Sequence, residues 1–346
     1  MTFHEKQSSI DNPVVNESGD STPLLAISHL FLAFDTWQGP AHVLSDVGIS
    51  VRKGEILGLV GESGCGKSVT ARAVMRILPR PPGRITGGQI HFEGTELLSL
   101  SEREMRRVRG RRMAMIFQEP MTSLNPVFTV GVQMGEVLRV HLGLSRAAAR
   151  DACADMLRQV RLPDPGEALK KYPHELSGGM RQRVMIATAL SRNPALLIAD
   201  EPTTALDVTV QGQVLAILRE MVRERGTSVL FITHDMGVVA QLCDRVCVMY
   251  AGAVAESAPI RELFARPAHP YTRGLIEAIP SVSDRSEALS AIPGTVPDLV
   301  DPPPGCRFHP RCPRRFAPCD REVPPLFEVG PDHFAACHLH GAEERP

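Results

Sequence analysis

The stretch that decides the fold is Gly61-Glu62-Ser63-Gly64-Cys65-Gly66-Lys67-Ser68, which follows the pattern G-x-x-x-x-G-K-[ST] at every position. Its glycines let the backbone bend so that successive N–H groups point at phosphate oxygens. In this pattern the lysine ammonium lies against the β- and γ-phosphates, and the hydroxyl of the last residue can ligate Mg²⁺. The stretch therefore predicts a nucleoside triphosphate site formed by these eight residues and the following Val69.

The flanks of this loop have the right local character. Residues 56–60 form an apolar run of strand type, and residues 69–77 have helical character. Upstream, residues 30–34 and 43–51 resemble strands of a small sheet, and Lys53-Gly54 resembles the turn after them. A strand, a loop and a helix are the context that a phosphate-binding loop requires, which disfavours a chance glycine-rich turn.

A second apolar run, residues 195–199, ends in two carboxylates, Asp200 and Glu201. In an α/β sheet the carboxyl end of a strand lies near the ligand. Asp200 is suited to hold Mg²⁺ directly or through water, and Glu201 to polarise the water that attacks the γ-phosphate. Beside a phosphate loop, a surface acidic pair that merely begins a turn is the weaker interpretation.

The rest of the chain alternates between strand and helix patterns. Residues 122–192 turn helical, with an amphipathic stretch at 147–160. A helical run at 208–225 then precedes a strand-like run at 228–233. Alternation of this kind predicts an α/β fold with a mostly parallel sheet.

Five further segments resemble those of the ABC ATPases, in the usual order along the chain. They are an aromatic residue ahead of the phosphate loop (Phe34), the Q-loop (Met115-Ile116-Phe117-Gln118), the signature (Leu176-Ser177-Gly178-Gly179-Met180), the D-loop (Thr204-Ala205-Leu206-Asp207) and the switch-histidine segment (Ile232-Thr233-His234-Asp235). One residue departs from the commonest signature, because Met180 stands where Gln is usual. The peptide-importer branch often has Met there.

The resemblance implies a role for each of these residues. Gln118 and His234 would join Glu201 and Lys67 in hydrolysis, with Gln118 also contacting the Mg²⁺ held by Ser68 and Asp200. The signature residues Ser177, Gly178 and Gly179 would close on the ATP of an opposite subunit. Asp207 would lie across that dimer interface. Phe34 matches the aromatic residue that stacks on adenine, with Trp37 as a nearby alternative.

Longer segments are similar to the dipeptide, oligopeptide and nickel importer ATPases. They are residues 118–126, 199–207, 269–272 and 309–313, and the resemblance extends from about Leu25 to Cys337. It implies an ATPase that powers peptide import from the cytoplasmic face of the cell membrane. The implied partners are two transmembrane permease subunits, a second identical or homologous ATPase and an extracytoplasmic solute-binding protein. Nickel chelates and glutathione-like solutes are alternative cargoes, and import rather than export rests on the same resemblance.

The resemblance also divides the chain. We expect a flexible polar tail at 1–24, a nucleotide-binding domain at 25–258 and a C-terminal extension at 259–346. The domain would combine a P-loop NTPase core, a small antiparallel β subdomain and a helical subdomain at about 120–192.

Four of the eight cysteines lie close together near the end of the chain, with the spacing C-x5-C-x6-C-x17-C; they are Cys306, Cys312, Cys319 and Cys337. Twelve of the 29 prolines fall between residues 293 and 346, so long helices are excluded there. These features predict a small metal-stapled module. Paired C-x2-4-C zinc knuckles are missing, whereas four thiolates can hold a [4Fe–4S] cluster, as in some members of the family. The cluster is favoured over zinc or no metal.

Composition excludes several other classes. The net charge of -1 argues against broad binding to nucleic acid. The sequence contains no run of about 18 uncharged apolar residues, which is the length that a membrane-spanning helix needs. A soluble ABC ATPase that acts on DNA or ribosomes is the alternative function, but the heptads of a coiled coil and a second cassette are both missing. A second alternative, an iron–sulfur sensor that only binds ATP, conflicts with the full set of hydrolytic residues.

Overall fold

A computed structural model gives the structure of residues 22–118, 123–204, 206–279 and 292–341. Most of the predicted tail lies outside these ranges, as do residues 119–122 of the importer-like segment and Ala205 of the predicted D-loop. Within the described ranges, no helix combines the length and apolar character needed to cross a membrane.

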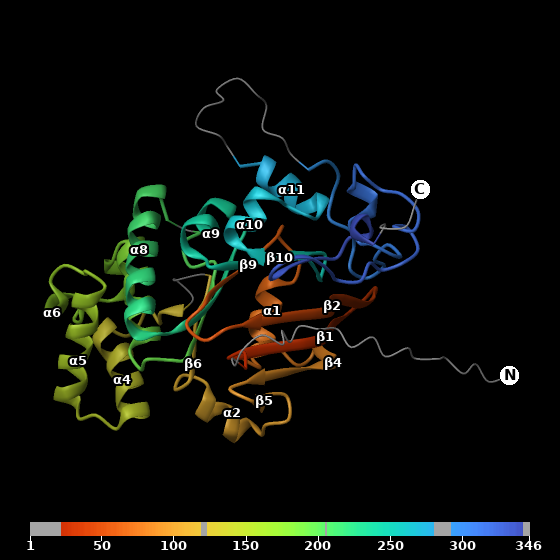
Figure 1. Ribbon diagram of the computed structural model, residues 1–346. Helices are drawn as coiled ribbons and strands as arrows, with labels where there is room; N and C mark the ends of the chain where they lie inside the picture. Colours follow the sequence, from red (N-terminus) through yellow and green to blue (C-terminus); the bar gives the residue numbers. More distant parts are fainter. Residues whose placement is uncertain (1–21, 119–122, 205, 280–291, 342–346) are drawn as a thin grey trace.

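Two sheets organise the described residues (Figure 1). The small sheet is antiparallel, in the order β2-β1-β4-β5. Its strands are β1 (Leu25–Thr36), β2 (Gly39–Val51), β4 (Gly83–Phe92) and β5 (Thr95–Glu96). It corresponds to the predicted small sheet. Strands β1 and β2 are longer than the apolar runs 30–34 and 43–51 that predicted them.

The large sheet has the order β11-β12-β10-β9-β3-β8-β7-β6. Its strands are β3 (Ile56–Val60), β6 (Met113–Ile116), β7 (Leu196–Asp200), β8 (Ser228–Thr233), β9 (Arg245–Tyr250), β10 (Ala253–Pro259), β11 (Phe327–Gly330) and β12 (His333–Ala335). The five strands from β9 to β6 run parallel, while β10, β12 and β11 add antiparallel pairs at one end. The predicted mostly parallel α/β arrangement is confirmed for the central strands.

Helices cover this sheet and extend to one side of it. They are α1 (Lys67–Val74), α2 (Glu102–Val108), α4 (Val130–Leu142), α5 (Arg146–Gln159), α6 (Pro165–Ala168), α7 (Gly178–Leu190), α8 (Val208–Arg225), α9 (Met236–Leu242), α10 (Ile260–Ala265) and α11 (Pro270–Glu277). Figure 1 shows α4, α5 and α6 gathered on one side of the molecule and residues 292–341 on the opposite side.

Central strands of the large sheet are buried on both faces. Along β3, Ile56 and Val60 belong to a core shared with the helices, whereas Leu57 and Leu59 belong to a core shared with the small sheet and α1. Side chains alternate across a strand, so a run that is apolar at every position indicates two covered faces. This explains why the strand before the phosphate loop is continuously apolar.

One predicted helix has different bounds in the structure. The run at 69–77 forms α1 only from Lys67 to Val74. It begins earlier because Gly66, at φ 102, leads directly into the first turn. It ends earlier because Arg76 adopts φ 51 and uses its guanidinium to reach the Leu97 and Leu100 carbonyls.

Candidate nucleotide hydrolysis site

The phosphate loop joins β3 to α1, and close packing requires glycine at two of its positions, Gly61 and Gly66. A Cβ at Gly61, which has φ 152, would lie 2.1 Å from the carbonyl oxygen of Met249. A Cβ at Gly66 would lie 2.7 Å from Leu44 Cδ2. Any larger residue at either position would therefore displace the loop.

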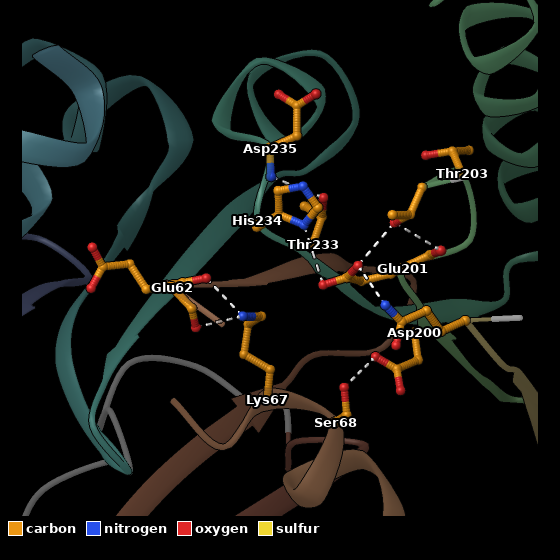
Figure 2. Close-up of polar contacts among 12 residues, drawn as sticks. Glu62, Lys67, Ser68, Asp200, Glu201, Thr203, Thr233, His234 and Asp235 are labelled. Atoms are coloured by element: carbon orange, nitrogen blue, oxygen red, sulfur yellow. Dashed lines mark hydrogen bonds and ion pairs between the residues drawn. The ribbon is translucent and has the colours of Figure 1, made fainter. Parts of the chain in front are cut away.

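Lys67 is the first residue of α1 and is buried, with 5 % of its surface exposed. Its Nζ donates hydrogen bonds to the carbonyl oxygens of Gly61 (2.7 Å) and Glu62 (3.0 Å), as Figure 2 shows for Lys67 and Glu62. The ammonium thus lies inside the curve of the loop, where a cation can meet phosphate oxygens.

Ser68, in the first turn of α1, contacts Asp200, the last residue of β7. The Ser68 hydroxyl donates to Asp200 Oδ1 at 2.8 Å, although the two residues are 132 positions apart (Figure 2). Burial raises the pKa of Asp200, and the neighbouring Glu201 adds to this, while Ser68, Arg72 and Lys67 act in the opposite direction. A hydroxyl and a carboxylate are oxygen ligands of the kind that Mg²⁺ prefers, so this donor pair fits a magnesium ion.

Glu201 is the centre of a hydrogen-bonded cluster just beyond β7 (Figure 2). Gln118 Nε2 donates to its Oε2 at 3.0 Å, and Thr204 Oγ1 donates to the same oxygen at 2.9 Å. His234 Nδ1 lies 3.3 Å from Oε1. The structure thus brings together three residues that the sequence indicated separately, and it adds Thr204, which sequence reasoning did not assign to the site.

Secondary structure explains how the histidine reaches this cluster. His234 follows the last residue of β8, and the adjacent Asp235 begins α9 by accepting hydrogen bonds from the Gly237 and Val238 N–H groups. The Asp235 N–H in turn donates to Thr233 Oγ1 at 3.0 Å. This turn holds the imidazole at the carboxyl end of the sheet.

The signature residues lie elsewhere. Ser177 begins α7, and its hydroxyl accepts a hydrogen bond from the Met180 N–H at 3.3 Å. A Cβ at Gly179 would lie 2.5 Å from Val210 Cγ1. Among the described residues, no hydrogen bond or ion pair joins Ser177, Gly178 or Gly179 to the phosphate loop, and their action on the ATP of an opposite subunit stays a prediction.

Asp207 and Phe34 also have structural roles of their own. The carboxylate of Asp207 begins α8 by accepting from the Val210 N–H at 2.9 Å. Phe34 is half-buried in β1 beside Gly83, at which a Cβ would lie 2.9 Å from its ring. Trp37, the alternative aromatic residue, lies in the tight turn between β1 and β2 and is 92 % exposed.

The four C-terminal cysteines line one small cavity together with aromatic and histidine side chains; the four are Cys306, Cys312, Cys319 and Cys337. Burial raises the pKa of Cys306 to about 11, and the other three cysteines add to this effect. Among the described residues, no three cysteine, histidine or acidic side chains converge closely enough to hold a single metal ion. The structure therefore does not establish the predicted metal at this position.

Comparison with known proteins identifies the family to which this chain belongs. The ABC transporter family matches residues 44–204, and the family described as the C-terminal region of oligopeptide/dipeptide transporters matches residues 255–319. A probable peptide ABC transporter ATP-binding protein of Sinorhizobium fredii is 52% identical over 91% of this chain and 94% of its own length. The chain belongs to the ATP-binding subunits of the ABC transporter family. The predicted resemblance to the peptide-importer branch is confirmed by these matches.

Other comparisons agree with this ABC assignment. The dipeptide transport ATP-binding protein DppD of Bacillus subtilis is 49% identical over 91% of this chain and 94% of its own length. Among solved structures, the dimeric ATP-binding cassette MJ0796 bound to ADP and Pi has a TM-score of 0.62 at 24% identity, covering 68% of this chain and 99% of that one. CbiO1 of Clostridium perfringens has a TM-score of 0.60 at 27% identity, covering 70% and 91%. The cassette fold and the ATPase activity are thereby shown.

Proposed function

We propose that this ABC ATPase powers the import of dipeptides or oligopeptides through a multisubunit transporter at the cytoplasmic face of the cell membrane. The identity of about 50% to peptide importer subunits over nine-tenths of the chain carries this proposal. The match of residues 255–319 to the oligopeptide/dipeptide C-terminal region supports it. Two permease subunits, a second ATPase and an extracytoplasmic solute-binding protein complete the proposed assembly.

Binding of ATP is assigned to the loop and its neighbours. The loop N–H groups and the Lys67 ammonium hold the phosphates, and the dipole of α1 favours their negative charge. Phe34 stacks on the adenine. Ser68, Asp200 and Gln118 would hold Mg²⁺, which would supply positive charge against the phosphates.

Hydrolysis is assigned to the cluster around Glu201. Its carboxylate accepts a proton from the attacking water, a general-base role. Gln118 and His234, both in contact with that carboxylate, orient the water and the γ-phosphate. Ser177, Gly178 and Gly179 act on the nucleotide of the opposite subunit, with Asp207 at the dimer interface.

An uptake assay tests the transported solute. In cells that depend on this chain, replacing Glu201 with glutamine should abolish accumulation of labelled dipeptide and tripeptide while leaving Ni²⁺ accumulation unchanged. The control variant is Glu220→Gln, because Glu220 lies on the surface of α8 and pairs with Arg161. Peptide uptake that persists in the Glu201 variant while Ni²⁺ uptake is lost would overturn the peptide assignment.

For the C-terminal extension we propose a small module in which Cys306, Cys312, Cys319 and Cys337 hold a [4Fe–4S] cluster. The location of all four thiols around one cavity supports this, because four thiolates are the usual ligands of such a cluster.

Metal analysis tests the cluster. Anaerobically purified protein should contain about four irons per chain with matching sulfide. Cys306→Ser should lose this iron, while Cys153→Ala, a buried cysteine of α5, should retain it. Stoichiometric zinc, or no metal in the wild-type chain, would contradict the cluster and leave the ATPase assignment intact.

A further inference from the structure

A short C-terminal segment, residues 306–312, lies between the cysteine cavity and the phosphate loop. Cys306 and Cys312, at its ends, line the cavity. Arg307 and Arg311, next to these cysteines in sequence, extend into the nucleotide-binding part of the chain. Arg307 donates to Ser45 Oγ at 2.6 Å. The segment therefore has one face on the cavity and one on the ATPase core.

Arg311 makes the closest contact with the phosphate loop. Its guanidinium forms a two-pronged ion pair with Glu62, with Nη1 2.6 Å from Oε2 and Nη2 3.1 Å from Oε1. Its remaining donors reach the carbonyls of Pro293 (2.9 Å) and Ile292 (3.1 Å) and the Tyr250 hydroxyl (3.3 Å). Only 6 % of the Arg311 side chain is exposed. A fully partnered, buried guanidinium has one orientation, so it fixes the carboxylate that it holds.

Glu62 is held from three directions. Its carboxylate points away from Lys67, as Figure 2 shows, while its carbonyl oxygen accepts from the Lys67 ammonium. Its N–H donates to the Tyr271 hydroxyl at 2.9 Å. Tyr271 is fully buried, with its ring 4.7 Å from that of Tyr250 and 5.3 Å from that of Phe308. The second residue of the loop is thus anchored to a rigid aromatic cluster and to Arg311.

Loop geometry matters because the phosphates are bound by backbone N–H groups, whose directions follow the backbone. A loop that is already held in the binding conformation loses less conformational freedom when the nucleotide binds. The Glu62 carboxylate cannot contact phosphate favourably, because both carry negative charge. Its ion pair with Arg311 instead acts on the backbone to which it is attached.

We infer that Arg311 is a positioning residue for the phosphate loop, so that nucleotide affinity depends on the C-terminal segment through the Arg311–Glu62 pair. This inference rests on the proposed assignment of residues 61–68 as the ATP phosphate site. It assigns to residues 306–312 a role in ATP binding that is separate from any metal in the cavity.

A double-mutant cycle tests the pair. The dissociation constant of a non-hydrolysable ATP analogue with Mg²⁺ is measured by calorimetry for Arg311→Met, Glu62→Gln and the double variant. Each single variant should bind about tenfold more weakly, equivalent to about 1.4 kcal/mol. The double variant should be no weaker than either single variant, because both remove the same interaction. Arg311→Lys should fall between Arg311→Met and the wild type.

Controls separate positioning from general stability. Arg321→Met, in the same C-terminal extension but outside residues 306–312 and with 79 % of its side chain exposed, should bind as the wild type does. In steady-state assays the Arg311 loss should fall mainly on KM rather than on kcat. If Arg311→Met fails to fold, the isosteric Glu62→Gln still tests the inference. Wild-type affinity in a folded Arg311→Met chain, or fully additive losses in the cycle, would overturn it. Failure of the wild-type chain to bind the analogue would instead refute the phosphate site.

Discussion

Replacing Glu201 with glutamine should stop hydrolysis without disturbing the fold. The carboxylate side chain is only 11 % exposed and has three partners. If the glutamine oxygen takes the position of Oε2, it can still accept from Gln118 and Thr204, which donate at 3.0 and 2.9 Å. The new NH₂ group can donate to His234 Nδ1, which lies 3.3 Å from Oε1. The hydrogen-bond network therefore survives, and the free energy of unfolding should change by less than about 0.5 kcal/mol.

What the substitution removes is the basic oxygen. A positioned general base accelerates a reaction by about 10²–10⁴-fold, which corresponds to about 3–5 kcal/mol of transition-state stabilisation. We therefore expect kcat for phosphate release at saturating ATP and Mg²⁺ to fall by at least about 100-fold. ATP binding should persist, so that the variant accumulates as a closed dimer on size-exclusion chromatography.

Phosphate release and dimerisation are measured on the wild type, Glu201→Gln and the surface control Glu220→Gln. The control should retain wild-type kcat, because Glu220 pairs with Arg161 on the exposed side of α8. A kcat for Glu201→Gln within about threefold of the wild type, with normal thermal stability, would refute the general-base assignment, because loss of the base should lower kcat at least about 100-fold.

Two further substitutions probe the loop and the C-terminal packing. Lys67→Ala removes the cation that lies against the Gly61 and Glu62 carbonyls and should weaken ATP binding at least about tenfold, or about 1.4 kcal/mol; unchanged affinity in a filter-binding assay would contradict the loop assignment. Glu256→Gln should lower Tm at neutral pH, because the buried carboxylate accepts from His333 Nε2 at 2.7 Å and from the Ala268 and His269 N–H groups. Burial raises the pKa of Glu256, but these hydrogen bonds outweigh burial and leave the pKa below its ordinary value of 4.5. The stabilisation of the fold by the ionised carboxylate is therefore present above that value and is lost as the pH falls below it. The Tm difference between the wild type and Glu256→Gln should therefore narrow on acidification, and a constant difference would contradict this.

Elements with complete local signals were predicted well. The helix expected at 208–225 has those bounds because Asp207 caps its start and Gly226, at φ 64, ends it. The strand at 228–233 is likewise as predicted. Both are specified by residues within a few positions of each other, through capping and continuous apolar character. Strand β7 is shifted by one residue, from 195–199 to Leu196–Asp200, because Asp200 still pairs with Ile232 of β8.

Contacts between distant segments could not be predicted in this way. The Arg311–Glu62 pair joins residues 249 positions apart, and β12 pairs with β10 across a segment rich in proline. Neither has a periodic signal, because a single side-chain pair or a three-residue strand leaves no pattern in the sequence. Thr204 was missed for a different reason. It lies inside a recognised motif, but its hydroxyl contact with Glu201 depends on the turn that follows β7.

Topology explains why these separate signals act at one place. Strands β9, β3, β8 and β7 are adjacent and parallel, so their carboxyl ends meet along one edge of the sheet. The phosphate loop follows β3, Glu201 follows β7 and His234 follows β8. Tyr250 ends β9, the neighbour of β3, and is where Arg311 arrives beside the loop. In such sheets ligands bind beyond the carboxyl ends of the strands. A C-terminal segment that packs at the end of β9 is therefore already next to the phosphate loop, which is why residues 306–312 can act on nucleotide binding.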